Sequence, residues 1–502
     1  MNKDFYLDKV RGGWFGKCLG GVAGMPFEGV PYSPEMTHND LHINEVPNDD
    51  LELQLIWLHG LKKHGLRLGA IEFGDLWREY IPHGCDEYCI ALRNLRRGIE
   101  PPASGWKDNF FTDGMGATIR SEIWAMIFPG RPDAAGYFAQ LDAQVDHWGD
   151  GVFGEIFMSV AESIAFTGSN VENALRTALH KIPADTKVHQ AVADIFKLYD
   201  AGTPETEVRD YIMLNYQRDS NFTYCVMNLV FIVYALLWGR EDFIKTILLA
   251  VNCGRDTDCT GASCGAFLGI ANGMAGIPDE WKYAVNEKLS LGEYVTRIPD
   301  IPLTFTELIR QTAELHEKLF PQLDESYPEY TPFVPEEDIP SLDAQKWILL
   351  ENAAPGEAEK IEKEIIETGK CPDHLSKNIV TFDGLFMDLS AYAHDACHLT
   401  MISYLSVENR EIRPENIQLS VTADVGSQLW IDGMRYMNHH SRAKMIPSFH
   451  RTEGGHSFGF HTEYGKHHVF RLELFYCLPP MRACVMFGNL FNDHLDGFKF
   501  DI

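Results

Sequence analysis

The sequence has few basic side chains and no long apolar run. Its 502 residues include 43 lysines and arginines against 72 aspartates and glutamates, which gives a formal net charge of −29. Duplex nucleic acids and anionic membrane surfaces both attract basic patches, so this balance argues against either partner. The longest apolar run, Val230 to Trp238, is far shorter than the roughly 20 residues of a membrane span. No apolar signal segment follows Met1, and we therefore expect a soluble, cytoplasmic protein.

The eleven cysteines show no pattern of a disulfide framework or of a zinc site. Only Cys85 and Cys89 lie close together, and no second pair completes the usual four-ligand spacing. We interpret the cysteines as free thiols in a reducing compartment. More than half of the twenty histidines lie from His374 onward, but their spacing selects no metal site either.

The length of the chain predicts two or three domains. Residues 1–320 have mostly helical apolar spacing, and the helices expected there cover 11–24, 51–61, 151–167, 171–180, 188–198, 208–214, 222–238 and 241–251. Residues 321–376 begin with a segment rich in proline and acids, and we expect a linker with two short helices, 341–350 and 356–368. From about residue 377 the apolar period changes to two, with a hairpin turn at Asp432-Gly433, which predicts an all-β sandwich over 377–502.

Two acidic pairs, Asp49-Asp50 and Asp256 with Asp258, carry the main functional signal. In so acidic a chain each pair alone would be a solvated turn. The second pair, however, leads directly into a run of small residues, 262–269, that suits a tightly packed helix. Four carboxylates brought together would repel one another unless hard divalent ions such as Mg²⁺ or Mn²⁺ lay between them. Such ions, or a local arginine, would also let this acidic chain bind an anionic small substrate.

Five segments in order resemble the ADP-ribosylglycohydrolase family, of the dinitrogenase reductase-activating type. They are the glycine-rich stretch 10–29, the triplet 48–50, and the segments 112–120, 145–150 and 228–276, so the resemblance covers about residues 5–320. It implies an all-α catalytic domain over 1–320, which together with the expected linker and jelly-roll-like β-sandwich makes a multi-domain chain. It also implies a metal-dependent glycohydrolase that cleaves a bond to C1 of ribose in an ADP-ribosyl or related ribosyl substrate.

The resemblance also implies roles for individual residues. The implied catalytic carboxylates are Glu28 and Asp50, and one or two Mg²⁺ or Mn²⁺ ions are the implied cofactors. The implied metal ligands are Asn48, Asp49, Asp50, Asp256, Asp258 and Cys259. The implied substrate contacts are Asp113, Gly114, Met115, Gly116, His147 and Arg255, of which Arg255 could instead pair with the carboxylates.

Three positions depart from the family pattern. Asn48 stands where Thr or Ser is usual, Cys259 where Thr is usual, and Gly21 where Asp is usual. Sulfur is a soft ligand that suits Mg²⁺ poorly, so one ion could be weakened, exchanged for Mn²⁺ or Zn²⁺, or lost.

Two alternatives therefore stay open beside an ADP-ribosyl hydrolase. One is a hydrolase of the same fold for another furanoside or carbohydrate, because residues 421–433 resemble strand–turn motifs of carbohydrate-associated modules. The other is a non-catalytic member that only binds ligand. The expected partners are a small ribosyl substrate, a modified protein or a glycan, without nucleic acid or membrane.

Overall fold

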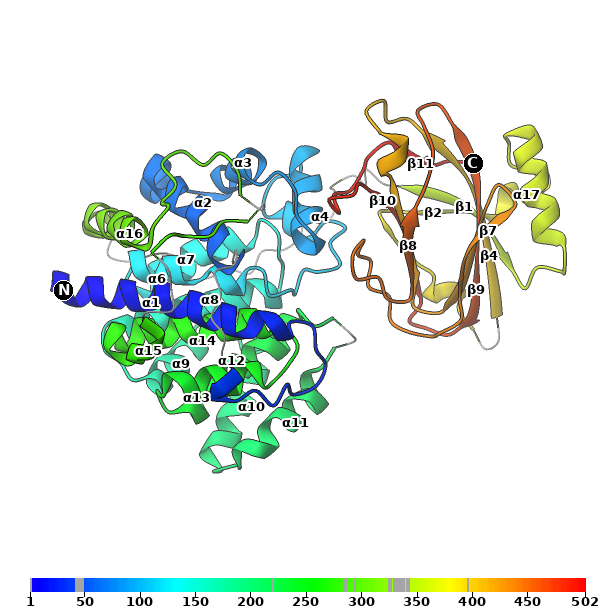
Figure 1. The fold of residues 1–502 in the computed structure, drawn as a ribbon. Coiled ribbons are helices and arrows are strands. Elements are labelled where there is room, and N and C mark those ends of the chain that lie inside the picture. Colours follow the sequence, from blue (N-terminus) through cyan, green and yellow to red (C-terminus); the bar gives the residue numbers. More distant parts are fainter. Residues whose placement is uncertain are drawn as a thin grey trace. The chain divides into compact units, whose positions relative to one another are not determined.

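The computed structural model divides the chain into a helical unit and a β unit (Figure 1). The helical unit comprises Met1–Pro82 and Asn94–Pro335, and the β unit comprises His83–Arg93 and Glu336–Ile502. The structure describes residues 2–40, 49–218, 221–282, 287–292, 295–323, 327, 339, 344–394 and 397–502. Within these ranges, no helix combines the length and apolar character that a membrane crossing needs.

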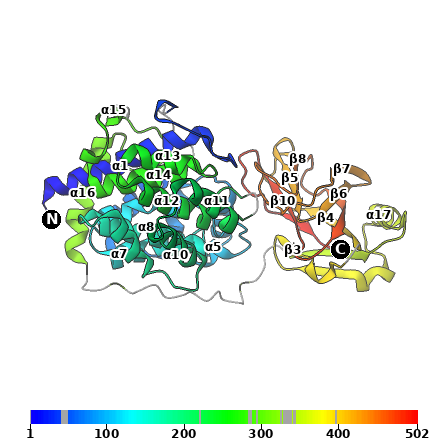
Figure 2. The same cartoon turned by 90° about the horizontal axis from the view of Figure 1, so that it is seen from below.

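The helical unit confirms the helices expected before residue 320. Its helices are α1 (Lys3–Gly24), α2 (Asp49–His64), α3 (Ala70–Tyr80), α5 (Ala103–Trp106), α6 (Glu122–Ile127), α7 (Pro132–Ala143), α8 (Asp150–Phe166), α9 (Val171–Leu179), α10 (Lys187–Asp200), α11 (Glu205–Tyr216), α12 (Cys225–Gly239), α13 (Phe243–Val251), α14 (Thr257–Asn272), α15 (Asp279–Lys282) and α16 (Phe305–Leu319), while α4 (Asp86–Arg96) starts in the β unit and ends in this one. Every residue of the apolar helix α12 is buried, and α12 packs against α8, α13 and α14 (Figure 2).

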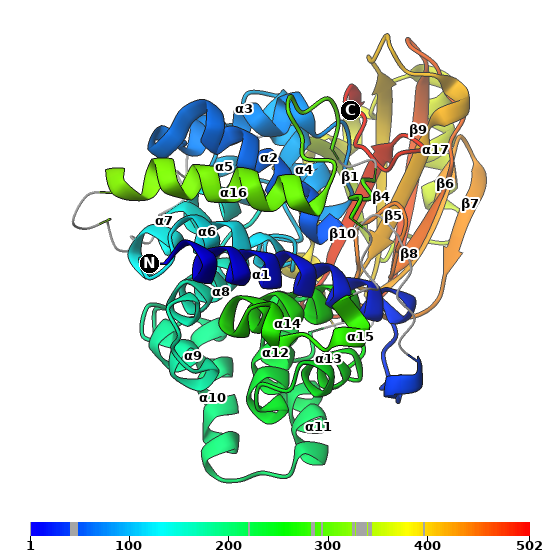
Figure 3. The same ribbon diagram turned by 60° about the vertical axis from the view of Figure 1, so that its left-hand side comes forward.

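Helices α1 and α14 lie antiparallel with their backbones in contact (Figures 1 and 3). Glycines of α1 spaced four residues apart, which share one helix face, meet residues of α14 that follow the same spacing: Gly12 meets Gly269, Gly16 meets Gly265, Gly20 meets Gly261, and Gly24 meets Thr257. A Cβ atom added at Gly16 would lie 2.0 Å from the carbonyl oxygen of Gly265. Any side chain on this face would therefore push the helices apart. The contact sets the start of α14 beside the end of α1.

A buried polar cluster links α2 to α1 and α6. The Lys17 Nζ atom lies 2.8 Å from the Glu122 carboxylate, and both side chains are fully buried. The Gln54 side-chain amide donates to the other oxygen of Glu122 at 2.7 Å. Gln54 follows Asp50 by about one helical turn, so this cluster positions the start of the helix that carries Asp49 and Asp50.

The β unit consists of two antiparallel sheets. Its strands are β1 (Gln345–Glu351), β2 (Ile379–Phe382), β3 (Phe386–Asp388), β4 (Cys397–Val407), β5 (Gln418–Ala423), β6 (Gly426–Ile431), β7 (Met434–His439), β8 (Gly455–Gly459), β9 (His467–Cys477), β10 (Arg482–Gly488) and β11 (Phe498–Phe500). One sheet has the order β2-β1-β4-β9-β6-β7 with β11 paired to β4, and the other has the order β3-β10-β5-β8. Side chains from both sheets form the core between them, and helix α17 (Glu357–Thr368) covers the outer face of the first sheet.

The hairpin between β6 and β7 confirms the turn expected at Asp432-Gly433. Ile431 pairs with Met434, and both turn residues have positive φ angles, 52° and 79°. Two positive φ angles belong to the tight turn whose twist matches that of the flanking strands.

The helix expected over 341–350 is wrong, whereas the helix expected over 356–368 is confirmed as α17. Residues 345–351 form β1, which pairs with both β2 and β4. Trp347 and Leu349 enter the core between the sheets, and Ile348 and Leu350 pack beneath α17. Because both faces of the strand are buried, the sequence shows a continuous apolar run without the alternation that marks a strand.

We expect Gly16→Ala to destabilise the helical unit, because its methyl group would collide with the backbone of α14. Overpacking of this kind costs about 1–3 kcal/mol, so the thermal unfolding midpoint followed by circular dichroism should fall by several degrees. The control is Gly459→Ala, where the added methyl group would meet no atom within 4 Å. Equal midpoints for Gly16→Ala and the wild type would contradict the packing.

We expect Glu162→Gln to reduce the loss of stability with rising pH. Burial raises the pKa of Glu162 well above its usual range, and the charge of Glu122 raises it further. The folded chain therefore keeps a proton on this group that the unfolded chain, with a carboxyl pKa of about 4.3, has lost at neutral pH. The stabilising contribution of Glu162 is therefore lost as the pH rises from about 4.3 towards the raised pKa of the folded chain. Glutamine has no proton to lose in this range, so the variant lacks this pH dependence. Unfolding midpoints between pH 5 and pH 8 should fall less for the variant, and parallel curves would refute the assignment.

Candidate active site

Three buried donor side chains gather at the start of α14. A carboxylate oxygen of Asp256, one of Asp258 and the sulfur of Cys259 all lie within 4.8 Å of one another. Asp256 is 1% exposed and forms the N-cap of α14, and Asp258 lies in its first turn and accepts a hydrogen bond from the Cys259 backbone at 2.9 Å. The positive end of the helix dipole favours carboxylates at these positions.

The loop before Asp256 is fastened to the segment that follows Glu28. The Gly29 N–H donates to the Arg255 carbonyl and the Arg255 N–H donates to the Val30 carbonyl, both at 2.7 Å. Gly254 has a φ of 71°, and a Cβ atom there would lie 2.4 Å from the Tyr32 carbonyl oxygen. The exposed Glu28 is thus held beside the loop that presents Asp256, while Arg255 is buried with a φ of 68°.

The structure describes only part of the first acidic pair. The backbones of Asp49 and Asp50 begin α2, but their side chains and all of Asn48 lie outside the described residues. Their expected roles as ligands stay predictions.

The segment 113–116 is fixed to the start of α12. The Cys225 N–H donates to the Asp113 carbonyl at 2.8 Å, and Gly114 forms a β-bridge with Tyr224. The Gly114 N–H donates to the Phe111 carbonyl at 2.9 Å, so this group is engaged within the protein. Met115 and Gly116 are buried as well.

Sequence analysis missed Arg218, whose guanidinium pairs with the Asp113 carboxylate. Burial raises the pKa of Asp113, and the charge of Arg218 opposes this rise. The Arg218 side chain is 33% exposed, so it brings a positive charge to a partly open position. No spacing in the sequence links the two residues.

Cys225, the first residue of α12, lies near both the segment 113–116 and the donor side chains at the start of α14. Burial raises the pKa of its thiol to about 12, and the charges of Asp150, Asp113 and Asp256 add to the rise. Three carboxylates from different parts of the chain therefore lie near one buried thiol, and the structure brings Asp113 and Asp256 into one region. Asp150 also accepts a hydrogen bond from the Val188 backbone at 3.1 Å.

His147 lies in a buried ion-pair network. It is 0% exposed, and its Nδ1 atom lies 3.0 Å from Asp146, which in turn pairs with Arg120 at 2.6 Å. Burial alone would raise the pKa of Asp146, but the charges of Arg120 and His147 lower it below its usual value. Its expected role as a substrate contact stays a prediction.

Comparison with known proteins assigns the helical part of the chain to a protein family. The family model described as ADP-ribosylglycohydrolase matches residues 2–317. The chain belongs to the ADP-ribosylglycohydrolase family. It is accordingly a hydrolase with that family's helical fold, and the strands of the β unit, which all lie from Gln345 onward, are outside the match.

Two relatives in this family are named ADP-ribosylarginine hydrolase Tri1. The protein of Pseudomonas putida is 23% identical over 58% of this chain and 77% of its own length. The protein of Serratia proteamaculans is 25% identical over 57% of this chain and 77% of its own length. A solved structure titled ADP-ribosylglycohydrolase-related protein complex covers 62% of this chain and 99% of its own, with 18% identity and a TM-score of 0.45.

The donor set can be tested against the divalent ion that the family implies. Asp256 and Asp258 offer buried carboxylate oxygens, which suit Mg²⁺ and Mn²⁺. Cys259 offers a sulfur at the same place, and a thiol suits Zn²⁺ better than Mg²⁺. The two carboxylates fit a hard divalent ion, and the thiol reduces the fit.

We expect Cys259→Thr to bind Mg²⁺ more tightly than the wild type, because a hydroxyl oxygen is a harder donor than sulfur. Isothermal titration of the purified chain with MgCl₂ would measure the change. The control is Cys253→Thr, a buried thiol six residues earlier whose sulfur donates to the Leu249 carbonyl instead. Unchanged Mg²⁺ affinity in Cys259→Thr would show that residue 259 does not contribute to an ion site.

Proposed function

We propose that the chain hydrolyses the bond between C1 of ribose and its acceptor in an ADP-ribosyl compound, with ADP-ribosylated arginine as the first substrate to test. Family membership supports a ribosyl substrate, and the names of the two relatives support arginine as the acceptor. The observation that carries the proposal is the buried cluster of Asp256, Asp258 and Cys259, fastened beside Glu28.

The proposed metal ligands are Asp256 and Asp258, joined by Asp49 and Asp50 from the start of α2. A bound Mg²⁺ or Mn²⁺ ion would supply Lewis-acid polarisation of a water or of the ribose hydroxyls. Cys259 departs from the hard-donor pattern and would shift the preference towards Mn²⁺ or Zn²⁺.

The remaining chemistry falls to side chains near this cluster. Cleavage at C1 passes through a state with oxocarbenium character, so carboxylates close to the ribose stabilise the developing positive charge. Glu28, which is exposed and directly precedes the backbone contact with the Asp256 loop, would accept the proton of the attacking water. Arg218, whose partly exposed guanidinium pairs with Asp113, would contribute positive charge for binding an anionic pyrophosphate.

Two alternatives keep specific support. The β unit after residue 336 lies outside the family match, which favours a different furanoside or a carbohydrate as substrate. The soft donor Cys259 favours a member that binds its ligand without catalysis.

We expect Asp258→Asn to remove metal-dependent turnover of ADP-ribosylarginine, and Glu28→Gln to lower kcat by about 10²–10⁴, the usual contribution of a general base. Release of ADP-ribose in MgCl₂ or MnCl₂ measures both. Asp279→Asn is the control, because Asp279 is an exposed carboxylate at the start of α15 that pairs with Lys282.

Three results would decide among the proposals. Full activity in Asp258→Asn and Glu28→Gln would reject the assigned site. Hydrolysis of nitrophenyl furanosides in place of ADP-ribosylarginine would favour the first alternative. Binding of ADP-ribose without any hydrolysis would favour the second.

A further inference from the structure

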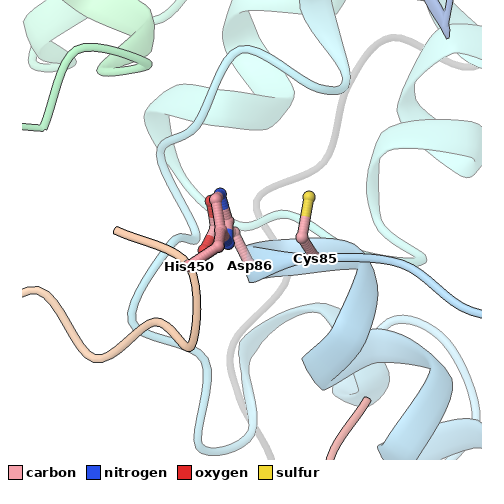
Figure 4. Close-up of side chains that lie close together, drawn as sticks. All are labelled: Cys85, Asp86 and His450. Carbon is pink, nitrogen blue, oxygen red and sulfur yellow. The ribbon is translucent and has the colours of Figure 1, made fainter. Parts of the chain in front are cut away.

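A second group of donor side chains lies within the β unit, on residues outside the five segments that resemble the family. The sulfur of Cys85, a carboxylate oxygen of Asp86 and a ring nitrogen of His450 all lie within 4.8 Å of one another. Figure 4 shows Cys85 and Asp86 at the start of α4 and His450 on a separate loop, between β7 and β8. Cysteine, histidine and aspartate are all side chains that bind zinc.

Asp86 has an oxygen that is available to an ion. Its side chain is 6% exposed, and its Oδ2 atom pairs with the Arg451 guanidinium. Its Oδ1 atom is buried and has no hydrogen-bond partner among the described residues. A buried carboxylate oxygen without a partner is unfavourable, and a bound cation would remove this penalty.

His450 is oriented as a metal-binding histidine is. Its Nδ1 atom lies 3.0 Å from the Ser448 hydroxyl, and its Nε2 atom lies 3.8 Å from Asp86 Oδ2. A separation of 3.8 Å is too long for a hydrogen bond, but it is close to the spacing of two ligands around one ion. A hydrogen bond from Nδ1–H to Ser448 would leave the lone pair of Nε2 facing Asp86, the arrangement that usually orients a histidine ligand.

The net negative charge around the cluster favours binding of a divalent cation. The Asp86 carboxylate pairs with the Arg451 guanidinium, and Glu87 follows Asp86 in the sequence. Because a metal-binding cysteine is deprotonated, Cys85 would add a third negative group near one guanidinium. One Zn²⁺ ion would neutralise the remaining charge.

We propose that Cys85, Asp86 and His450 bind one Zn²⁺ ion, with a water molecule in the fourth position of the tetrahedron. Cys85 and His450 are both partly exposed, which leaves the site open to an incoming ion. The ion joins the start of α4 to the loop that carries His450. It thereby strengthens the attachment of residues 83–93 to the rest of the β unit, which the structure already secures through Arg93 with Asp496 at 3.2 Å and Cys89 with the Asn492 carbonyl at 3.1 Å.

The test is zinc binding by the full chain after removal of bound metal with a chelator, in a buffer that keeps thiols reduced. Titration calorimetry with ZnCl₂ gives affinity and stoichiometry, and Co²⁺ substitution gives a thiolate-to-cobalt absorption band. Cys85→Ala and His450→Gln should each weaken this Zn²⁺ binding at least tenfold, and Cys85→Ala should reduce the cobalt band. Cys371→Ala and His461→Gln, which change a partly buried thiol and an exposed histidine elsewhere in the β unit, should leave both unchanged.

Because Cys259 could also bind Zn²⁺, the same titrations are repeated in an Asp258→Asn, Cys259→Ala background. One Zn²⁺ per chain that persists there and disappears on adding Cys85→Ala supports the site. Absence of Zn²⁺ binding in this background, or binding that survives Cys85→Ala and His450→Gln, overturns it. Without metal, the variants should unfold at the same temperature as the wild type. Added Zn²⁺ should raise the unfolding midpoint of the wild type but not those of the variants. A wild-type midpoint that does not respond to Zn²⁺ overturns the proposed strengthening of the β unit.

Discussion

The contact between the backbones of α1 and α14 is the constraint on which the candidate site depends. Glycines at every fourth position of α1 let the two helices approach until backbone meets backbone. Thr257 then donates its hydroxyl hydrogen to the Gly24 carbonyl at 2.8 Å, which fixes the first turn of α14 at the end of α1. Glu28 and Asp256 are neighbours because these two helix ends coincide, although most of the helical unit lies between them in the sequence.

Much of this arrangement could be predicted from the sequence, since its signals are local. The four-residue spacing of glycines, the small residues after Asp258 and the uniformly apolar α12 each indicate a packed helix through residue types alone. The hairpin at Asp432-Gly433 is a two-residue signal of the same kind. Strand β1 was mispredicted because its alternate residues enter two different cores, which hides the period of two.

Contacts between distant residues could not be predicted in this way. Arg218 reaches Asp113 across the chain, and His450 meets Cys85 and Asp86, without any fixed spacing in either case. The scattered cysteines and histidines gave no zinc pattern, because two of the three donors in the β unit are adjacent and the third comes from a remote loop. The side chains of Asp49 and Asp50 and all of Asn48 lie outside what the structure describes, so their roles rest on the family resemblance.

The assignment of residues 83–93 to the β unit has a consequence for how the chain is divided. The polypeptide passes between the units at 82–83, at 93–94 and at 335–336, and α4 itself contains the second of these crossings. The β unit is therefore discontinuous and is not a simple C-terminal appendage. A fragment that begins at residue 336 would lack residues 83–93 of the β unit. A chain that ends at residue 335 would keep residues 83–93 without the rest of that unit.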